Sequence, residues 1–188
     1  VVTSGPVELG SNTACLAVNV PVTTTTCPAT DTSGPVDTTS PPPTGDALLY
    51  IRSGRLYKVS QAQLYLPQTF TFLQDGWTDL AGGSGALMMT TPLATSCGSD
   101  ETCRNRYFRR LVLWSEGPNQ HDIGGQSALA LRGVLFTPNA LSTFTGQAGQ
   151  QQADAQFWTR KLEVKGQGTL VMAADPDAAI SRPRSAIT

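Results

Sequence analysis

The residues best suited to acid–base chemistry surround the single histidine of the chain. His121 lies in the segment Asn-Gln-His-Asp-Ile-Gly-Gly, with Asp122 beside it and Ser115 nearby. A serine, a histidine and a carboxylate are the parts of a nucleophilic hydrolase. However, adjacent residues of a strand point to opposite faces, and no Gly-x-Ser-x-Gly turn is present to expose a nucleophile. We therefore expect a histidine in a loop and no catalytic triad.

Paired carboxylates are the second candidate chemistry, because glycoside cleavage needs two carboxyl groups about 5–9 Å apart across a cleft. All candidate pairs lie in turn-rich sequence, where aspartate commonly binds the backbone. Calcium binding by Asp100 and Glu101, helped by backbone carbonyls, would need more oxygen ligands than this part of the sequence offers. We predict no catalytic residue, no cofactor and no metal site. The pairs are Asp75 with Asp79, Asp175 with Asp177, and Asp100 with Glu101.

The densest positive charge is a cluster of four arginines, Arg104, Arg106, Arg109 and Arg110. Strand alternation would place the first two on one face and split the last two between faces. A solvated strand face explains the cluster. The functional alternative is an interaction patch that docks an acidic glycan or a neighbouring subunit.

Four cysteines fall into two local pairs, Cys15 with Cys27 and Cys97 with Cys103. Three pairings are open, and we favour the local one because each pair closes a short, turn-rich loop. A zinc site would need CxxC or Cys/His spacing, and only one histidine exists. Disulfides imply an oxidising compartment outside the cytosol.

Composition favours an all-β protein. Only 14% of the 188 residues are charged, whereas threonine, serine, glycine and proline are plentiful. The net charge of −1 argues against nucleic acid as a partner. No run approaches the roughly 20 apolar residues that cross a membrane. The chain begins at Val1 without a methionine, so a signal or membrane anchor could precede it.

Three segments follow from the pattern. Residues 1–45 form an arm with a disulfide loop and a Thr/Pro-rich linker, of a composition typical of extended loops or O-glycosylated stalks. Residues 46–175 alternate apolar and polar residues between glycines and predict an all-β domain. Residues 176–188 form an irregular tail. A weak helix is predicted over 148–157.

Four aromatic residues could form a sugar-binding row, but core packing explains them better. They are Tyr50, Tyr57, Tyr65 and Trp77.

Two similar units, residues 128–146 and 156–172, each read as strand, polar turn and strand at an offset of roughly 27 residues. This spacing is typical of stacked coils. A short right-handed parallel β-helix is therefore the leading fold, with an extended Thr/Pro-rich N-terminal arm. A β-sandwich would show similar strands and is the alternative.

The stretch from Leu131 to Ala140, then Phe144-Thr-Gly146, Ala155-Gln-Phe157 and Leu162 to Gly168, resembles the C-terminal region of actinobacterial cell-envelope proteins associated with pili. The resemblance covers about residues 125–175. It implies a short right-handed β-helix displayed outside the membrane, and it brings no catalytic residues. The chain lacks the family's membrane segment, and its Thr/Pro arm has no counterpart.

The leading hypothesis is an extracellular, bacterial, non-enzymatic structural protein: the ectodomain of a pilus-associated or envelope scaffold or adhesin. Its partners would be protein subunits, either copies of itself or other envelope proteins, or a surface glycan. The first alternative is a carbohydrate-binding or carbohydrate-active module, which predicts paired carboxylates in a groove or an exposed aromatic row. The second is a phage or capsid structural protein, for which disulfides would be unusual.

Overall fold

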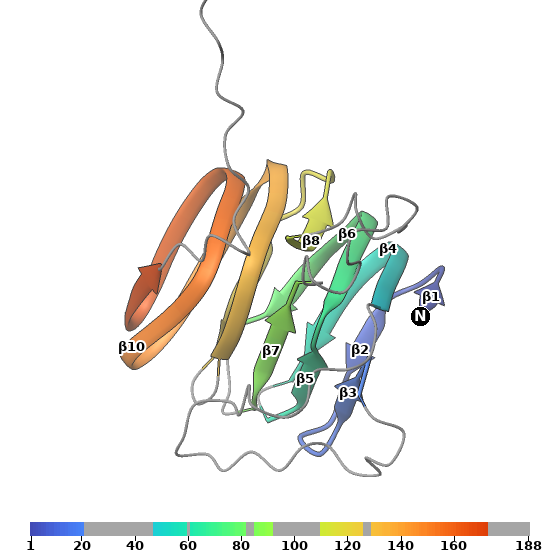
Figure 1. Ribbon diagram of the computed structural model, residues 1–188, viewed down its shortest axis with the longest axis horizontal. Coiled ribbons are helices and arrows are strands. Elements are labelled where there is room, and N and C mark those ends of the chain that lie inside the picture. The colour runs from blue at the N-terminus through green and yellow to red at the C-terminus, as the bar shows by residue number, and fades with distance from the viewer. Residues whose placement is uncertain (21–46, 60, 82–84, 92–109, 126–128, 173–188) are drawn as a thin grey trace, which may run out of the picture.

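The computed structural model describes residues 1–20, 47–59, 61–81, 85–91, 110–125 and 129–172, without the side chains of 147–153 and 167–171. Every regular element in this part of the chain is a strand, and each strand pairing is parallel (Figure 1). The strands are β1 (Val2–Thr3), β2 (Val7–Leu9), β3 (Cys15–Ala17), β4 (Ala47–Lys58), β5 (Gln63–Leu66), β6 (Thr69–Leu80), β7 (Leu87–Thr90), β8 (Leu111–Ser115), β9 (His121–Gly125) and β10 (Leu129–Met172).

The strand register repeats about every 22 residues. Ala47 lies opposite Thr69, and Leu135 lies opposite Leu113. Partners are farther apart in sequence where residues 21–46 or 92–109 intervene, as between Val2 and Tyr50. The chain therefore stacks in units that we call layers. The first is residues 2–17, the second 47–66, the third 69–90, the fourth 111–132, the fifth 134–155 and the sixth 156–172.

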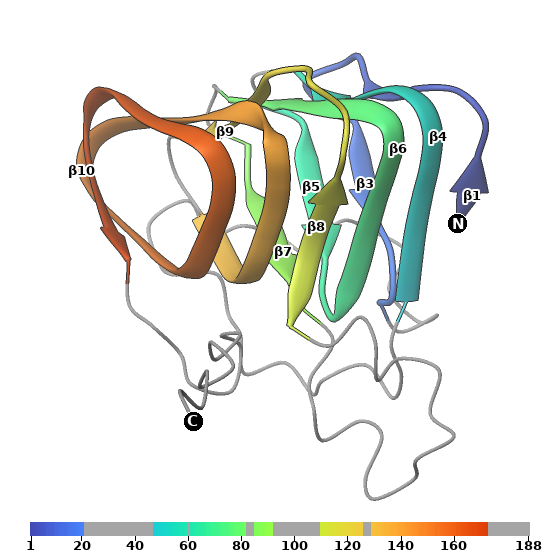
Figure 2. The same ribbon diagram turned by 90° about the horizontal axis from the view of Figure 1, so that it is seen from above.

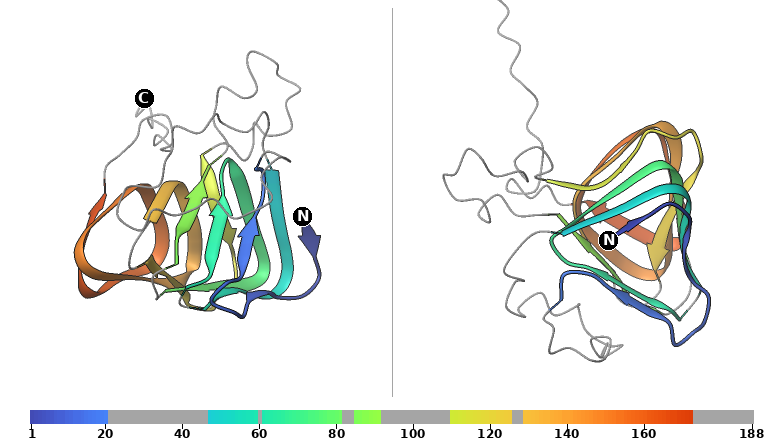
Figure 3. Two further views of the ribbon diagram at one scale, coloured as in Figure 1. Left: turned by 90° about the horizontal axis from the view of Figure 1, so that it is seen from below. Right: turned by 90° about the vertical axis from the view of Figure 1, so that its right-hand side faces the viewer.

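The layers share one interior (Figures 2 and 3). Seen down the stack, their ribbons have a three-sided outline, with the first layer at one end and the sixth at the other (Figure 3). Because alternate strand residues point to opposite faces, the inward positions form files that run through successive layers. One such file is fully buried and consists of Leu49, Thr71, Leu113 and Leu135.

Two corners of the layers depend on backbone with positive φ. At one corner, Asn19, Gln68, Arg110 and Gly133 all have positive φ. Side chains tie neighbouring layers there, since Asn19 Nδ2 donates to Pro67 O at 3.1 Å and Gln68 N donates to Thr90 Oγ1 at 2.9 Å. At another corner, Gly54 has φ +89 and packs against Pro6, where a Cβ would lie 3.0 Å from the proline. These corners let the strands change direction, and the register of β10 against β8 shifts between Val134 and Leu135, directly after Gly133.

Several predictions can be compared with the fold. The all-β class is confirmed, and residues 1–20 contribute three strands that pair with β4 and β5. The helix over 148–157 is wrong, because those residues belong to β10. The offset of 27 residues is also wrong, since the repeat is about 22. The Thr/Pro linker and the tail after residue 175 lie outside the described residues. Within the described residues, no helix is long and apolar enough to span a membrane.

Candidate functional site: an outward aromatic file

The most distinctive surface feature is a file of five aromatic rings, one from each layer after the first. Leu49 and Ile51 point inward and are fully buried, so Tyr50 between them points outward. The parallel register places Phe72 opposite Tyr50, and Trp114 opposite Phe72 and Phe136. Trp158 continues the line in the sixth layer. We call Tyr50, Phe72, Trp114, Phe136 and Trp158 the aromatic file.

The rings of the aromatic file contact one another along its whole length. Consecutive ring centroids are 5.4, 6.0, 5.5 and 6.1 Å apart. The Tyr50 and Phe72 rings are stacked, whereas Trp114 meets both of its neighbours edge to face. Such pairs contribute about 0.5–1.5 kcal/mol each beyond the area that they bury. The file therefore stabilises the stacking of layers.

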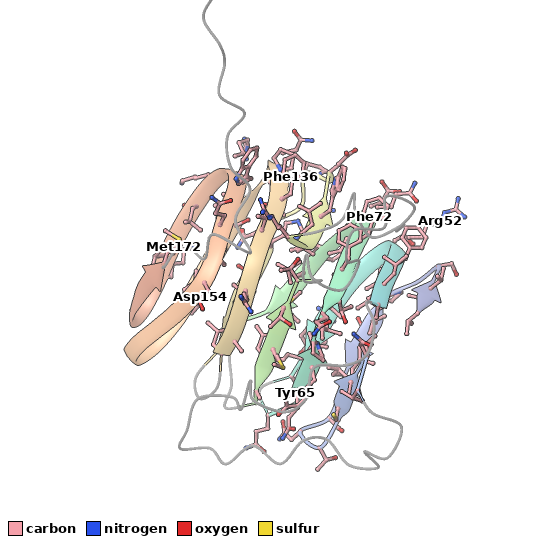
Figure 4. The ribbon with its side chains drawn as sticks, viewed as in Figure 1. Arg52, Tyr65, Phe72, Phe136, Asp154 and Met172 are labelled. Carbon is pink, nitrogen blue, oxygen red and sulfur yellow. The ribbon has the colours of Figure 1, made fainter. Side chains whose placement is uncertain are left out.

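Polar side chains border the aromatic file two positions further along the chain in four of its five layers, and the fifth layer has Pro138 there. Tyr50 Oη donates a hydrogen bond to Gln74 Oε1, and Trp114 Nε1 donates to Glu116 Oε1 at 3.2 Å. Arg52 and Arg160 are exposed at the matching positions of the second and sixth layers. Phe72, Phe136 and Arg52 lie along the same edge of the stack (Figure 4). Apolar rings thus lie next to groups that bind hydroxyls and carboxylates.

A smaller apolar cluster supports the other side of the aromatic file. Phe70, Leu111 and Val134 are buried together, and Phe72, Trp114 and Phe136 pack against them. The Phe70 and Phe72 rings are almost parallel, with centroids 6.3 Å apart. Because neighbouring side chains pack around them, the central rings of the file have restricted freedom.

A second outward file carries charge. Arg55 Nε donates to Glu8 Oε1 at 2.8 Å, and its Nη1 lies 3.3 Å from Asp79 Oδ2. The guanidinium also lies 4.0 Å from the centroid of the Tyr57 ring. The hydrogen bond to Glu8 raises the pKa of Arg55. These contacts link the first, second and third layers on the outside of the stack.

The sequence predicted His121 in a loop, and this prediction is wrong. His121 begins β9, and its side chain is fully buried. The backbone N–H of Thr78 donates to His121 Nδ1 at 3.2 Å, so the proton of the neutral ring is on Nε2. Burial lowers the pKa of His121 to about 4, partly opposed by Asp122. Asp122 is only half-buried and binds Gln120, and Ser115 donates to Gly76 O at 3.0 Å. These three side chains therefore make separate contacts and do not form a relay.

The remaining predicted site residues fall mostly outside the described part of the chain. Cys15 is disulfide-bonded and no described cysteine is free. Its pairing with Cys27, and that of Cys97 with Cys103, stays a prediction because those three residues are not described. Of the arginine patch, only Arg110 is described: its φ is 71° and its carbonyl accepts a bond from Val134 N. Arg104, Arg106 and Arg109 lie outside, so the patch stays untested.

The carboxylate pairs can be placed only in part. Asp79 forms an ion pair with Arg55. Asp75 is exposed and lies opposite Ser53 in the register of β4 and β6. Asp100, Glu101, Asp175 and Asp177 are not described. Among the described residues, no three histidine, cysteine, aspartate or glutamate side chains gather to hold a metal ion.

Sequence reasoning singled out Tyr50 but missed the other four members of the aromatic file. Tyr57 contacts Arg55, Tyr65 is buried against Ala86, and Trp77 lies opposite Arg55. The signal for the file was present: the positions 50 and 72, and then 114, 136 and 158, are 22 residues apart. A search for aromatic residues at one constant spacing would have found these two groups, but not the link between Phe72 and Trp114.

Comparisons of the chain with protein-family models, curated proteins and solved structures find no match. The function must therefore be argued from the described residues.

Proposed function

We propose that this chain is a non-enzymatic structural protein of the bacterial cell surface, the ectodomain of a pilus-associated or envelope scaffold or adhesin. It is built as a short right-handed parallel β-helix, in which the Thr/Pro-rich residues 21–45 connect the first layer to the second. It acts through contacts with other subunits or with a surface partner, not through a reaction.

Three features support the β-helix. All described pairings are parallel, whereas Greek-key sandwiches are antiparallel. The register advances about 22 residues per layer, as expected when one coil stacks on the next. Crossovers between parallel strands of one sheet are right-handed in nearly all proteins, which supports the handedness.

The aromatic file is the observation that carries the functional proposal. It spans the second to the sixth layer, and its rings pack against one another on the outside of the stack. A row of rings that pack against one another suits contact with a partner surface. The disulfide at Cys15 supports an oxidising location such as the cell exterior.

Immunogold electron microscopy of the source cells, with antibody against residues 46–175, tests this function. Label along filaments or the envelope is expected for a structural subunit, and label at filament tips or bases for an adhesin. Diffuse label in the medium, with none on cells or appendages, would overturn the proposal.

Carbohydrate binding is the second candidate, because an exposed aromatic row is one of the features that it predicts. Trp158 is the member most available for stacking on a sugar, with 40% of its surface exposed. Arg160, two positions along the same strand, is exposed and could bind sugar hydroxyls or an acidic sugar.

Binding of the purified chain to cell-wall polysaccharides tests this candidate. Trp158→Ala should weaken binding, whereas Trp77→Ala, on a different outer face, is the matched control. No binding by the unmodified chain, or equal loss in both variants, would reject it.

A further inference from the structure

Among the described residues, no further layer covers the apolar side chains at the end of the sixth layer. Gly166 approaches Gly146 of the fifth layer, because a Cβ on Gly166 would lie 2.1 Å from Gly146 O. Val164 therefore follows Phe144 in an inward file, two residues before each glycine. Phe144 is 1% exposed and Val164 is 51% exposed. Trp158 likewise ends the aromatic file.

The first layer is uncovered at the opposite end of the same files. Within the described residues, β1 and β2 pair only with β4, and β3 pairs only with β5. Val2, opposite Tyr50, begins the outward line that continues as the aromatic file, and it is 72% exposed. Val7 and Leu9 begin the inward files that end near Leu162 and Val164. Strand edges of this kind accept another parallel strand.

The two ends carry opposite charge. Glu8 is the only charged side chain of residues 2–17. Residues 156–172 contain Arg160, Lys161 and Lys165 against one acid, Glu163. Lys161 and Lys165 lie 2.5 and 2.9 Å from the Glu163 carboxylate, and their hydrogen bonds lower its pKa to about 2. The sixth layer is thus net positive around Glu163, which takes the position of the outward file that Glu8 begins and has a lysine two residues away on either side.

We propose that the sixth layer of one chain docks on the first layer of a second copy and continues the stack in register. Trp158 packs on Val2, Val164 covers Leu9, and the lysines beside Glu163 face Glu8. The inference rests on the structural role proposed above, for which it names the partner. Because the two docking surfaces differ, the contact is head to tail and repeats to give filaments instead of closing as a dimer.

Sedimentation velocity of the purified chain over a range of concentrations tests the contact. The unmodified chain should form dimers and longer species, and rising salt should weaken them because the ends carry opposite charge. Val164→Asp should raise the dissociation constant by about tenfold or more. The matched control is Leu48→Asp, which changes an apolar residue with 43% exposure on the outer face of the second layer. Both variants should keep the thermal transition of the unmodified chain, and only Val164→Asp should lose association.

Mixing two end-blocked variants tests the head-to-tail geometry. Val164→Asp blocks the sixth layer, and the double variant Val2→Lys with Glu8→Lys blocks the first. Each should be monomeric alone, and an equimolar mixture should give one-to-one dimers and nothing longer.

A chain that stays monomeric at every concentration, equal loss of association in the Leu48 control, or no dimer in the mixture would overturn the proposal. These results come from purified protein and the immunogold label comes from cells. Failure of stacking and failure of the surface role can therefore be told apart.

Discussion

Two regions of the interior use the same positions with different chemistry. In the second and third layers, one inward file is apolar, and in the fourth and fifth layers the same file is polar. A neighbouring inward file changes in the same direction one layer earlier. The first file runs Ile51, Leu73, Ser115 and Thr137, and the second runs Leu56, Thr78, His121 and Ser142.

The polar residues of these files are tolerated because most of them have a hydrogen-bond partner. Ser115 binds the carbonyl of Gly76, and the Thr137 and Ser142 hydroxyls lie 2.9 Å apart. Burial of a hydroxyl costs little when such a bond replaces water, and costs more when it does not. His121 Nε2 is buried without a partner among the described atoms. The difference teaches that a layer needs inward side chains of suitable size, whereas their polarity can vary where partners are within reach.

Truncation within the first file should show the largest effect. Leu73→Ala removes buried methyl groups from the main core cluster and should lower the free energy of unfolding by about 2–5 kcal/mol. Ser115→Ala, at the next position of the file, loses one hydrogen bond and should cost about 1 kcal/mol. Urea denaturation of both variants measures the difference. Equal losses would show that the apolar and polar layers are not distinct in stability.

The strands were predictable where local alternation is strong. Thr69 to Leu73 alternates aromatic residues with threonine and belongs to β6, and the apolar run from Leu111 to Trp114 belongs to β8. The helix over 148–157 failed because the helix preference of alanine and glutamine is weak and strand pairing in β10 overrides it.

The aromatic file was not predictable by the same local reasoning. Residues 92–109 separate the third-layer residue Phe72 from Trp114 and widen their spacing beyond the repeat. His121 was missed for a related reason. Its surrounding residues are typical of a turn, and only the parallel register with Ser142 makes its position inward. Both features depend on contacts between layers, which no single segment encodes.

Acid should weaken the polar region through His121. Its pKa is about 4 in the folded chain and about 6.5 when unfolded, so between these values the unfolded state binds more protons. Stability should therefore fall as pH drops from 6.5 to 4, by up to about 3 kcal/mol, and this contribution should level off below pH 4. Urea denaturation from pH 7 to pH 4 measures the loss.

The matched variant for this test is His121→Leu, which gives the second file a leucine like that at position 56. Its stability should depend less on pH over the same interval, while the carboxylates common to both proteins titrate as before. The same pH dependence in both proteins would mean that His121 is already protonated, or solvated, in the folded chain.

The smallest effect should come from the hydroxyl pair that links the two polar files within the fifth layer. Thr137→Val and Ser142→Ala each remove one partner of the buried 2.9 Å contact and leave the other unsatisfied. The double variant removes both, so it should be more stable than the sum of the two single losses predicts, by about 0.5–1 kcal/mol. A double-mutant cycle in urea measures this coupling. Coupling near zero would mean that each hydroxyl finds another partner. The tolerance of the interior for polar residues would then come from water or backbone groups, and not from pairing between the files.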